Sequence, residues 1–320
     1  MVLPGILSHP LVFNTLVLIA SLYILIKSAD LIVDSISSYA RKLGLSDAII
    51  GLVVVAMAAS SAEIVSSVTG FITGYEEIGL GTVLGNNMIH AALALGLLAT
   101  FGGKIKLEPN IFTKQRLAMW LALMLPFVLA ADGLLSRSDG VVLLTAFALY
   151  LLYLWKIEGT FGKIKKDVKI KNIWQDALIF LGCFAALLLA GRWLVFSSVQ
   201  IADYFNISEY FVGLVLISLV VTADDFAIEL KSLFKKHSSI GLGDLLGSLL
   251  IELLLLLGIV SVIKPLEINV PQVLNALIFL SLSITVMMSW MNKKYLTRKH
   301  GLILIGLYAA FITIEIWKIL

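Results

Sequence analysis

Residues 78–85 read Ile-Gly-Leu-Gly-Thr-Val-Leu-Gly, and residues 240–247 read Ile-Gly-Leu-Gly-Asp-Leu-Leu-Gly. The two stretches belong to a longer repeat, because residues 43–96 correspond without a gap to residues 205–258 at a constant offset of 162 positions. Glycines recur at the same places in both copies. The chain therefore contains an internal duplication.

Each copy of the repeat carries one acid in an apolar surrounding. Glu63 in the first copy is aligned with Asp225 in the second. Both copies are apolar and long enough to cross a bilayer. An acid inside a membrane is energetically unfavourable, and a functional site is the default interpretation of one. An acid in each copy of an internal repeat points to a transporter.

Composition places the chain among membrane proteins. Its 320 residues are 60% hydrophobic and 14% charged, and the mean hydropathy is +1.01, which is too apolar for a soluble domain of this length. Most of its apolar stretches hold about the 20 residues that a bilayer-spanning helix needs. Ten stretches are predicted to span, at residues 11–36, 46–73, 78–102, 113–131, 139–157, 174–201, 208–232, 239–263, 271–291 and 301–318. The single cysteine, Cys183, excludes an internal disulfide.

The basic residues predict how the spans are oriented. Of the 24 Lys and Arg residues, 19 fall on alternate connections between the spans, beginning with the first. By the positive-inside rule these connections are cytoplasmic, and both termini lie outside. The expected location is a multi-pass position in a prokaryotic cell membrane.

The number of spans in each repeat determines how the two halves are related. Five spans are an odd number, so the second repeat enters the membrane from the opposite side. We therefore predict an all-α polytopic membrane protein with ten transmembrane helices in two inverted-topology five-helix repeats. The predicted parts are a first repeat at 1–157 with its motif at about 46–96, a basic cytoplasmic linker at 158–173, and a second repeat at 174–320 with its motif at about 208–258.

Polar residues concentrate in the second and third spans of each repeat. Ser60 lies one helical turn before Glu63, and Thr222 lies one turn before Asp225. Two polar stripes with four-residue spacing follow in the third spans, formed by Thr82, Asn86 and His90 in the first repeat and by Asp244, Ser248 and Glu252 in the second. A two-fold axis between the repeats would bring the two acids together near the bilayer midplane. Carboxylates, hydroxyls, amides and carbonyls suit calcium rather than a soft transition metal.

The paired acids and the Gly-x-Gly-x-x-x-Gly stretches resemble the alpha motifs of the calcium/cation antiporter superfamily, the sodium/calcium exchangers and their proton-coupled relatives. The resemblance covers both alpha regions and the whole topology. It implies a secondary antiporter that moves calcium against sodium or protons. It also implies that Glu63 and Asp225 are the central divalent ligands, with the backbone carbonyls of Ala59 and Val221 beside them. The positions implied for the flanking ion sites are Ser60, Asn86, Thr222, Ser248 and Glu252; His90 and Asp244 share their stripes and are further candidates for the coupling ion.

The chain departs from the exchanger motif at several positions. The helix-breaking proline of the exchangers is Ala62 in one copy and Asp224 in the other, so no proline enforces local unwinding here. His90 stands where the exchangers have Asn, and Glu252 stands where they have Asp. An imidazole among closely spaced acids favours protons over sodium as the coupling ion, because a cation that binds can displace a proton.

Other interpretations stay open at the level of sequence. A passive channel would need a continuous pore, and no stretch looks like a selectivity filter. A non-transporting relative is compatible with the degenerate motifs, and His90 could be a hydrogen-bonded core histidine. An enzyme is not expected, because a His-Glu-x-x-His pattern, a Gly-x-Ser-x-Gly elbow and a P-loop are missing. We expect no cofactor and no nucleic-acid partner; the expected partners are the lipid bilayer and the transported cations, around a monomeric transport unit.

Overall fold

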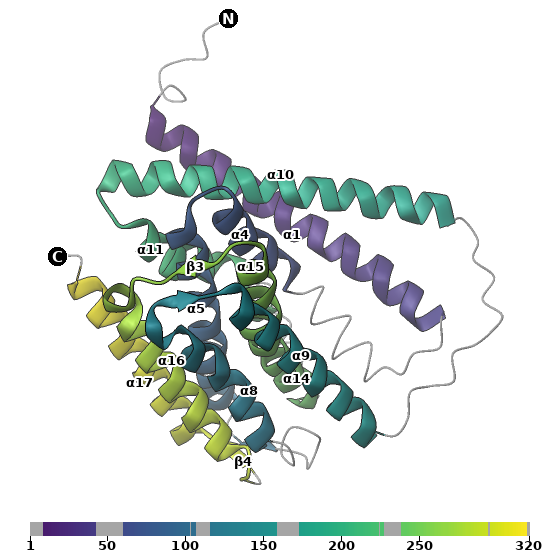
Figure 1. Ribbon diagram of the computed structural model, residues 1–320, viewed down its shortest axis with the longest axis vertical. Helices are drawn as coiled ribbons and strands as arrows, with labels where there is room; N and C mark the ends of the chain where they lie inside the picture. Colours follow the sequence, from purple (N-terminus) through teal and green to yellow (C-terminus); the bar gives the residue numbers. More distant parts are fainter. Residues whose placement is uncertain are drawn as a thin grey trace, which may run out of the picture.

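A computed structural model describes most of the chain as a helical bundle (Figure 1). The described residues are 9–42, 60–102, 104–106, 116–158, 173–223, 225–226, 238–293 and 295–318. The predicted linker at 158–173 therefore lies almost entirely outside the described residues, as does Ala59.

The described elements of the first half are mainly helices. In chain order they are α1 (Pro10–Lys42), α4 (Ser61–Ile72), α5 (Glu76–Met88), the π-helix η2 (Ile89–Ala94), α6 (Leu95–Phe101), β1 (Lys104–Lys106), α8 (Arg116–Leu129), the 3-10 turn η3 (Ala130–Asp132), β2 (Leu134–Leu135) and α9 (Arg137–Glu158).

The second half repeats much of this order. Its elements are α10 (Ile173–Phe205), α11 (Glu209–Phe211), the π-helix η4 (Val212–Ile217), α12 (Ser218–Val221), α14 (Ser238–Leu250), the π-helix η5 (Ile251–Leu256), α15 (Leu257–Ile263), β3 (Leu266–Glu267), α16 (Val270–Trp290), β4 (Tyr295–Thr297) and α17 (Arg298–Trp317). We predicted an all-α chain. Within the described residues, four short strands accompany the helices.

Six helical segments within the described residues are long and apolar enough to cross a membrane. They are Pro10–Ser28, Glu76–Phe101, Leu181–Phe205, Leu242–Ile263, Val270–Trp290 and Arg298–Trp317. Each coincides with one of the ten stretches predicted from the sequence. Shorter apolar helices occupy Glu63–Ile72 and Glu209–Val221, where two further spans were predicted.

The two longest helices, α1 and α10, lie side by side along one flank of the bundle (Figure 1). Each has 33 residues. Buried leucine and valine side chains from both helices, including Leu18, Leu25, Leu194 and Val199, share one hydrophobic cluster. The opposite sides of both helices expose large apolar residues such as Phe13 and Trp193. Apolar side chains that face outward suit a lipid environment.

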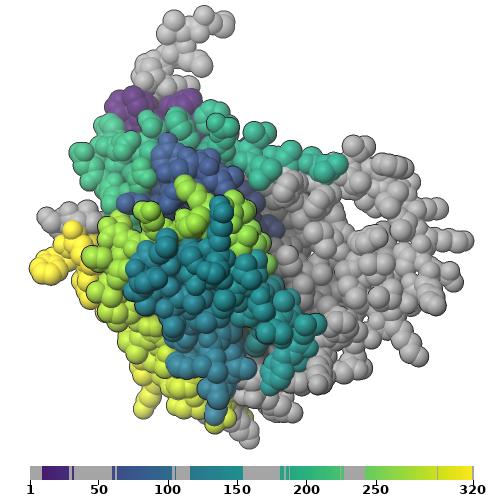
Figure 2. Space-filling view, viewed as in Figure 1, coloured from purple at the N-terminus to yellow at the C-terminus, as the bar shows by residue number. Residues whose placement is uncertain are grey.

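The centre of the bundle is a crossing between α5 of the first half and the η4–α12 segment of the second. A Cβ atom on Gly85 would lie 2.1 Å from the backbone oxygen of Leu214, and one on Gly213 would lie 2.4 Å from that of Ile78. Only glycine permits backbones to approach this closely. Figure 2 shows the first half, in blue and teal, directly against the second half, in green and yellow, on the visible face.

Two short antiparallel ribbons close the bundle at its ends. β1 pairs with β4, with Lys104 opposite Thr297 and Lys106 opposite Tyr295. β2 pairs with β3, with Leu134 opposite Glu267. In both ribbons one strand comes from each half. The ribbons therefore tie the connections of the two halves together.

Candidate functional site

The backbone departs from regular α-helix at equivalent positions shortly before the two acids. Ser60, immediately before α4, has φ −70° and ψ 6°, and Thr222, immediately after α12, has φ −86° and ψ 0°. A ψ near 0° departs from the regular α-helix. Glu63 and Asp225 each come three residues after these positions. The backbone is thus irregular at both positions although no proline is present.

His90 and Glu252 occupy equivalent places in two π-helices. His90 is the second residue of η2, and Glu252 is the second residue of η5. Single-turn π-helices within α-helices occur frequently at functional sites, because the wider turn re-aims its side chains. The sequence predicted one polar stripe along a helix in each of these spans. It did not predict the π-helical turns that the structure shows there.

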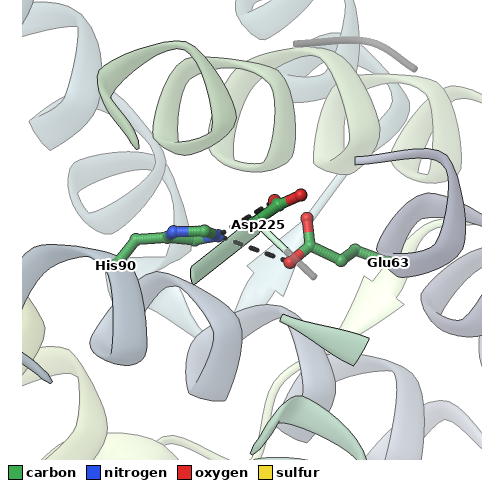
Figure 3. A group of neighbouring side chains, drawn as sticks. All are labelled: Glu63, His90 and Asp225. Carbon is green, nitrogen blue, oxygen red and sulfur yellow. Dashed lines mark hydrogen bonds and ion pairs between the residues drawn. The ribbon is translucent and has the colours of Figure 1, made fainter. Parts of the chain in front are cut away.

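Glu63, His90 and Asp225 form one buried group (Figure 3). The His90 Nε2 atom lies 3.3 Å from Glu63 Oε1 and 3.8 Å from Asp225 Oδ2. One candidate ligand atom from each residue lies within 4.8 Å of the other two. The exposed fractions are 0% for Glu63, 1% for His90 and 1% for Asp225. The structure therefore brings the two predicted acids to one place, with the imidazole reaching both.

Electrostatics explains why this group can hold a positive charge. Two carboxylates enclosed in a low-dielectric interior are unfavourable unless a cation or proton neutralises them. His90 can supply that charge as an imidazolium, and a metal cation bound at the acids can supply it instead.

Glu252 is a second acid from the second half of the chain beside the site. Its carboxylate accepts a hydrogen bond of 3.0 Å from Asn86 Nδ2 and one of 2.7 Å from Asn87 Nδ2. Asn87 Nδ2 also donates to the backbone oxygen of Val83, at 2.7 Å. Glu252 lies close enough to Glu63 to interact with its charge. Asn86 and Glu252 were predicted for the site, whereas Asn87 was not. In the sequence, the position of Asn87 directly after Asn86 was the feature that could have identified it as a site residue.

The remaining predicted residues lie around this group in different ways. Ser60 Oγ donates to Ser248 Oγ at 3.1 Å and so joins the two halves. Thr222 Oγ1 donates to the backbone oxygen of Ser218 at 2.7 Å, which is a bond within its own helix. Val221 is fully buried, and Asp244 is 7% exposed. None of these five predicted residues belongs to the buried group of Glu63, His90 and Asp225.

A separate cavity of about 610 Å³ opens at the end of the bundle that carries β2 and β3. Three acids, Glu76, Glu77 and Glu267, line it together with the buried Tyr210. The residues of the buried group are not among its lining. The cavity and the buried group thus share none of these lining residues.

Comparisons with known proteins agree with this architecture. A family model described as "Sodium/calcium exchanger protein" matches residues 13–156 and 176–317. The inner membrane protein YrbG of Escherichia coli is 26% identical over 95% of this chain and 97% of its own length. The sodium/calcium exchanger MaX1 of Methanosarcina acetivorans is 24% identical over 94% of this chain and 98% of its own length.

Two solved structures share the fold. The sodium-calcium exchanger NCX_Mj superposes with a TM-score of 0.67 at 21% identity, over 95% of this chain and 98% of that chain. The H⁺/Ca²⁺ exchanger CAX superposes with a TM-score of 0.76 at 15% identity, over 97% of this chain and 87% of that chain. At these identities the likeness shows that all three have the same arrangement of helices.

Proposed function

The chain belongs to the sodium/calcium exchanger family, and from this membership we propose that it is a secondary antiporter exchanging a divalent cation for protons at Glu63 and Asp225. The family consists of membrane transporters, so the chain is a transporter and not an enzyme. Calcium is the first candidate for the cation, because the names of the exchangers similar to this chain specify it.

The observation that carries the proposal is the meeting of the two acids. Glu63 and Asp225 are 162 positions apart, at equivalent places in the duplication, yet both contact His90 in one buried group. A buried acid that recurs at the same place in both copies has no evident packing role. Two carboxylates offer a dehydrated divalent cation the charge that it needs.

The arrangement of the halves supports ten spans in two inverted repeats, at 1–157 and 174–320. The π-helix η2 begins at Ile89 and η5 begins at Ile251, again 162 positions apart. Adding the same offset to the first residue of β1, Lys104, gives Leu266 in β3, and adding it to Leu134 in β2 gives Leu296 in β4. Exchange of the two halves therefore converts the β1–β4 ribbon into the β3–β2 ribbon. A two-fold axis requires this relation.

Such an arrangement favours alternating access over a channel. In a transporter built from inverted repeats, rocking of one part against the other opens a midplane site to each side in turn. The closed position of the buried group is compatible with a state between the two openings. Both termini would lie on the outer side of the cell membrane. One chain contains both halves of the site.

The choice of protons over sodium rests on His90. A buried imidazole beside two carboxylates can keep a proton that an arriving cation displaces, since metal ligands must be deprotonated to bind. We further propose that Ser60, Asn86, Thr222, Asp244, Ser248 and Glu252 form the surrounding coupling-ion region, with the backbone carbonyls of Ala59 and Val221 beside the acids. The competing account is that sodium fills this region.

Flux measurements in liposomes test the proposal. Purified protein is reconstituted, and uptake of calcium, manganese and magnesium is followed under a pH gradient or a sodium gradient separately. We expect uptake to respond to the pH gradient at equal sodium on both sides. Uptake driven by sodium at clamped pH, without any response to a pH gradient, would show that the coupling ion is sodium and not the proton. Absence of divalent uptake under either gradient would overturn the antiporter proposal itself.

A further inference from the structure

The imidazole of His90 gives the site a ligand that calcium does not favour. We propose that the group of Glu63, His90 and Asp225 binds a borderline transition-metal cation, such as zinc, in preference to calcium. This inference rests on the proposed antiport at the same site and names the class of cation that it selects. Calcium is then a weaker substrate.

The positions of the ligand atoms fit such an ion. Transition-metal divalent ions bind imidazole nitrogen and carboxylate oxygen at about 2.0–2.2 Å, which places neighbouring ligand atoms about 3–3.6 Å apart. His90 Nε2 lies 3.3 Å from Glu63 Oε1 and 3.8 Å from Asp225 Oδ2. A short inward movement of Asp225 would complete a three-ligand site. In Figure 3 the imidazole and the two carboxylates point toward one another from separate parts of the chain.

The chemistry of the donors separates the two classes of ion. Imidazole suits zinc, copper, iron and nickel, whereas carboxylate, carbonyl and water oxygens suit calcium, magnesium and manganese. Calcium takes six to eight oxygen ligands. At this site a nitrogen atom occupies a position next to both acids, where an oxygen would be expected for calcium. A nitrogen ligand is therefore less favourable for calcium than for zinc.

Several polar groups near the acids are hydrogen-bonded to each other, whereas the amide oxygens of Asn86 and Asn87 accept no hydrogen bond from the described residues. Both carboxylate oxygens of Glu252 accept hydrogen bonds, one from Asn86 and one from Asn87. Ser60 and Ser248 are hydrogen-bonded to each other. A calcium ion that recruited these groups would have to break bonds between buried polar atoms, which is unfavourable in a low-dielectric interior. A transition metal needs fewer ligands and can complete its shell with water.

The competing account makes His90 only an internal counter-charge. In that account the imidazolium neutralises the acids when the site is empty and moves away when any divalent cation binds. The two accounts differ in one observable property, which is whether the His90 nitrogen contacts the bound metal.

Spectroscopy of bound manganese tests that contact directly. Purified protein in detergent is loaded with Mn²⁺, and electron spin echo envelope modulation records coupling to ¹⁴N. We expect nitrogen modulation in the native protein and its loss in His90→Asn and in His90→Gln, which place an amide there. His9→Asn is the matched control, because His9 is exposed near the start of α1. Bound Mn²⁺ without nitrogen modulation in the native protein, or absence of Mn²⁺ binding, would overturn the inference.

Competition for uptake gives the second measurement. In liposomes we expect Zn²⁺ to inhibit ⁴⁵Ca²⁺ uptake at concentrations at least about tenfold below that of unlabelled Ca²⁺, a difference of about 1.4 kcal/mol. Because His90→Gln also removes the proposed coupling residue, its selectivity is measured as competition for ⁴⁵Ca²⁺ binding to the detergent-purified protein, where the ratio should fall toward one. A native protein that transports calcium and prefers it to zinc would overturn the inference and leave antiport intact. Failure of every cation to move would overturn antiport, while the manganese spectrum would still decide whether His90 is a ligand.

Discussion

At the scale of single residues, the site combines what the duplication predicts with what only the structure reveals. The alignment of Glu63 with Asp225 could be found from the sequence, because an offset of 162 positions relates all residues of the two copies. The contact of His90 with both acids could not be found from the sequence. Four-residue spacing identifies the helix face on which His90 lies, but it does not identify the side chains that this face contacts across the bundle. Asn87 was missed for the same reason. Its partner Glu252 is 165 positions away.

One prediction at this scale concerns the pH dependence of transport. Because protons compete with the metal for its ligands, divalent binding in the native protein should weaken as the pH falls. His90→Asn removes one proton-binding ligand, so the decline should become shallower, while binding at the two acids is largely retained. Initial rates of divalent uptake measured between about pH 6 and 8 check this, since an unperturbed imidazole titrates near 6.5.

The control for this prediction is His9→Asn, which removes a histidine outside the site. Its pH profile should match that of the native protein. If His90→Asn also matched the native profile, with normal uptake, proton coupling through His90 would be excluded. His90 would then be a hydrogen-bonded histidine of the protein core without a role in coupling.

At the scale of single elements, the close crossing of α5 and η4 holds the two halves in contact. The glycine pattern predicted close approach but not which helices meet. The irregular backbone angles at Ser60 and Thr222 were also not predictable from the motif, because proline is absent there and tertiary packing determines the backbone. The π-helices η2 and η5 left no distinct pattern either, since leucine and alanine fit any helix type.

The crossing gives a prediction for stability. Gly85→Ala would place a Cβ atom 2.1 Å from the backbone oxygen of Leu214, and backbone atoms cannot yield as a flexible side chain can. Overpacking of this kind typically lowers the free energy of unfolding by about 1–3 kcal/mol. We expect the thermal transition of the detergent-purified protein to fall by several degrees and transport to fall with it.

Gly306→Ala is the matched control, because no atom lies within 4 Å of a Cβ placed there. The same change should leave the transition unchanged or raise it, since alanine favours a helix over glycine by about 1 kcal/mol. Equal transitions for the two variants would show that the crossing is looser than described.

At the scale of the whole molecule, six long apolar segments and two ribbons define the bundle, and the charge pattern adds an orientation. The sequence predicted the positions of these six spans because length and hydropathy are local properties. The strand pairs and the packing of α1 on α10 join residues far apart in the chain. Such pairings depend on tertiary contacts, and periodicity alone does not contain them.

The predicted orientation can be tested with single cysteines. The ribbons lie apart in Figure 1, with β3 at about mid-height of the view, below α10, and β4 at the bottom. In a Cys183→Ala background, Glu267→Cys in β3 should react with a membrane-impermeant thiol reagent added outside cells. Tyr295→Cys in β4, which is 38% exposed, should react only after the membrane is opened. Labelling of both cysteines from the same side would contradict the proposed topology.

The most direct measurement of the central claim is divalent-cation uptake by the two amide variants, Glu63→Gln and Asp225→Asn, in liposomes. Each variant keeps the size of its side chain but removes one of the two charges offered to the cation. Glu315→Gln is the control, because Glu315 is also buried, at 3% exposed, but its partners Asn275 and Lys318 lie outside the site. The account predicts background uptake in both site variants and native uptake in the control. Native uptake in either site variant would contradict it, and would show that the paired acids are structural.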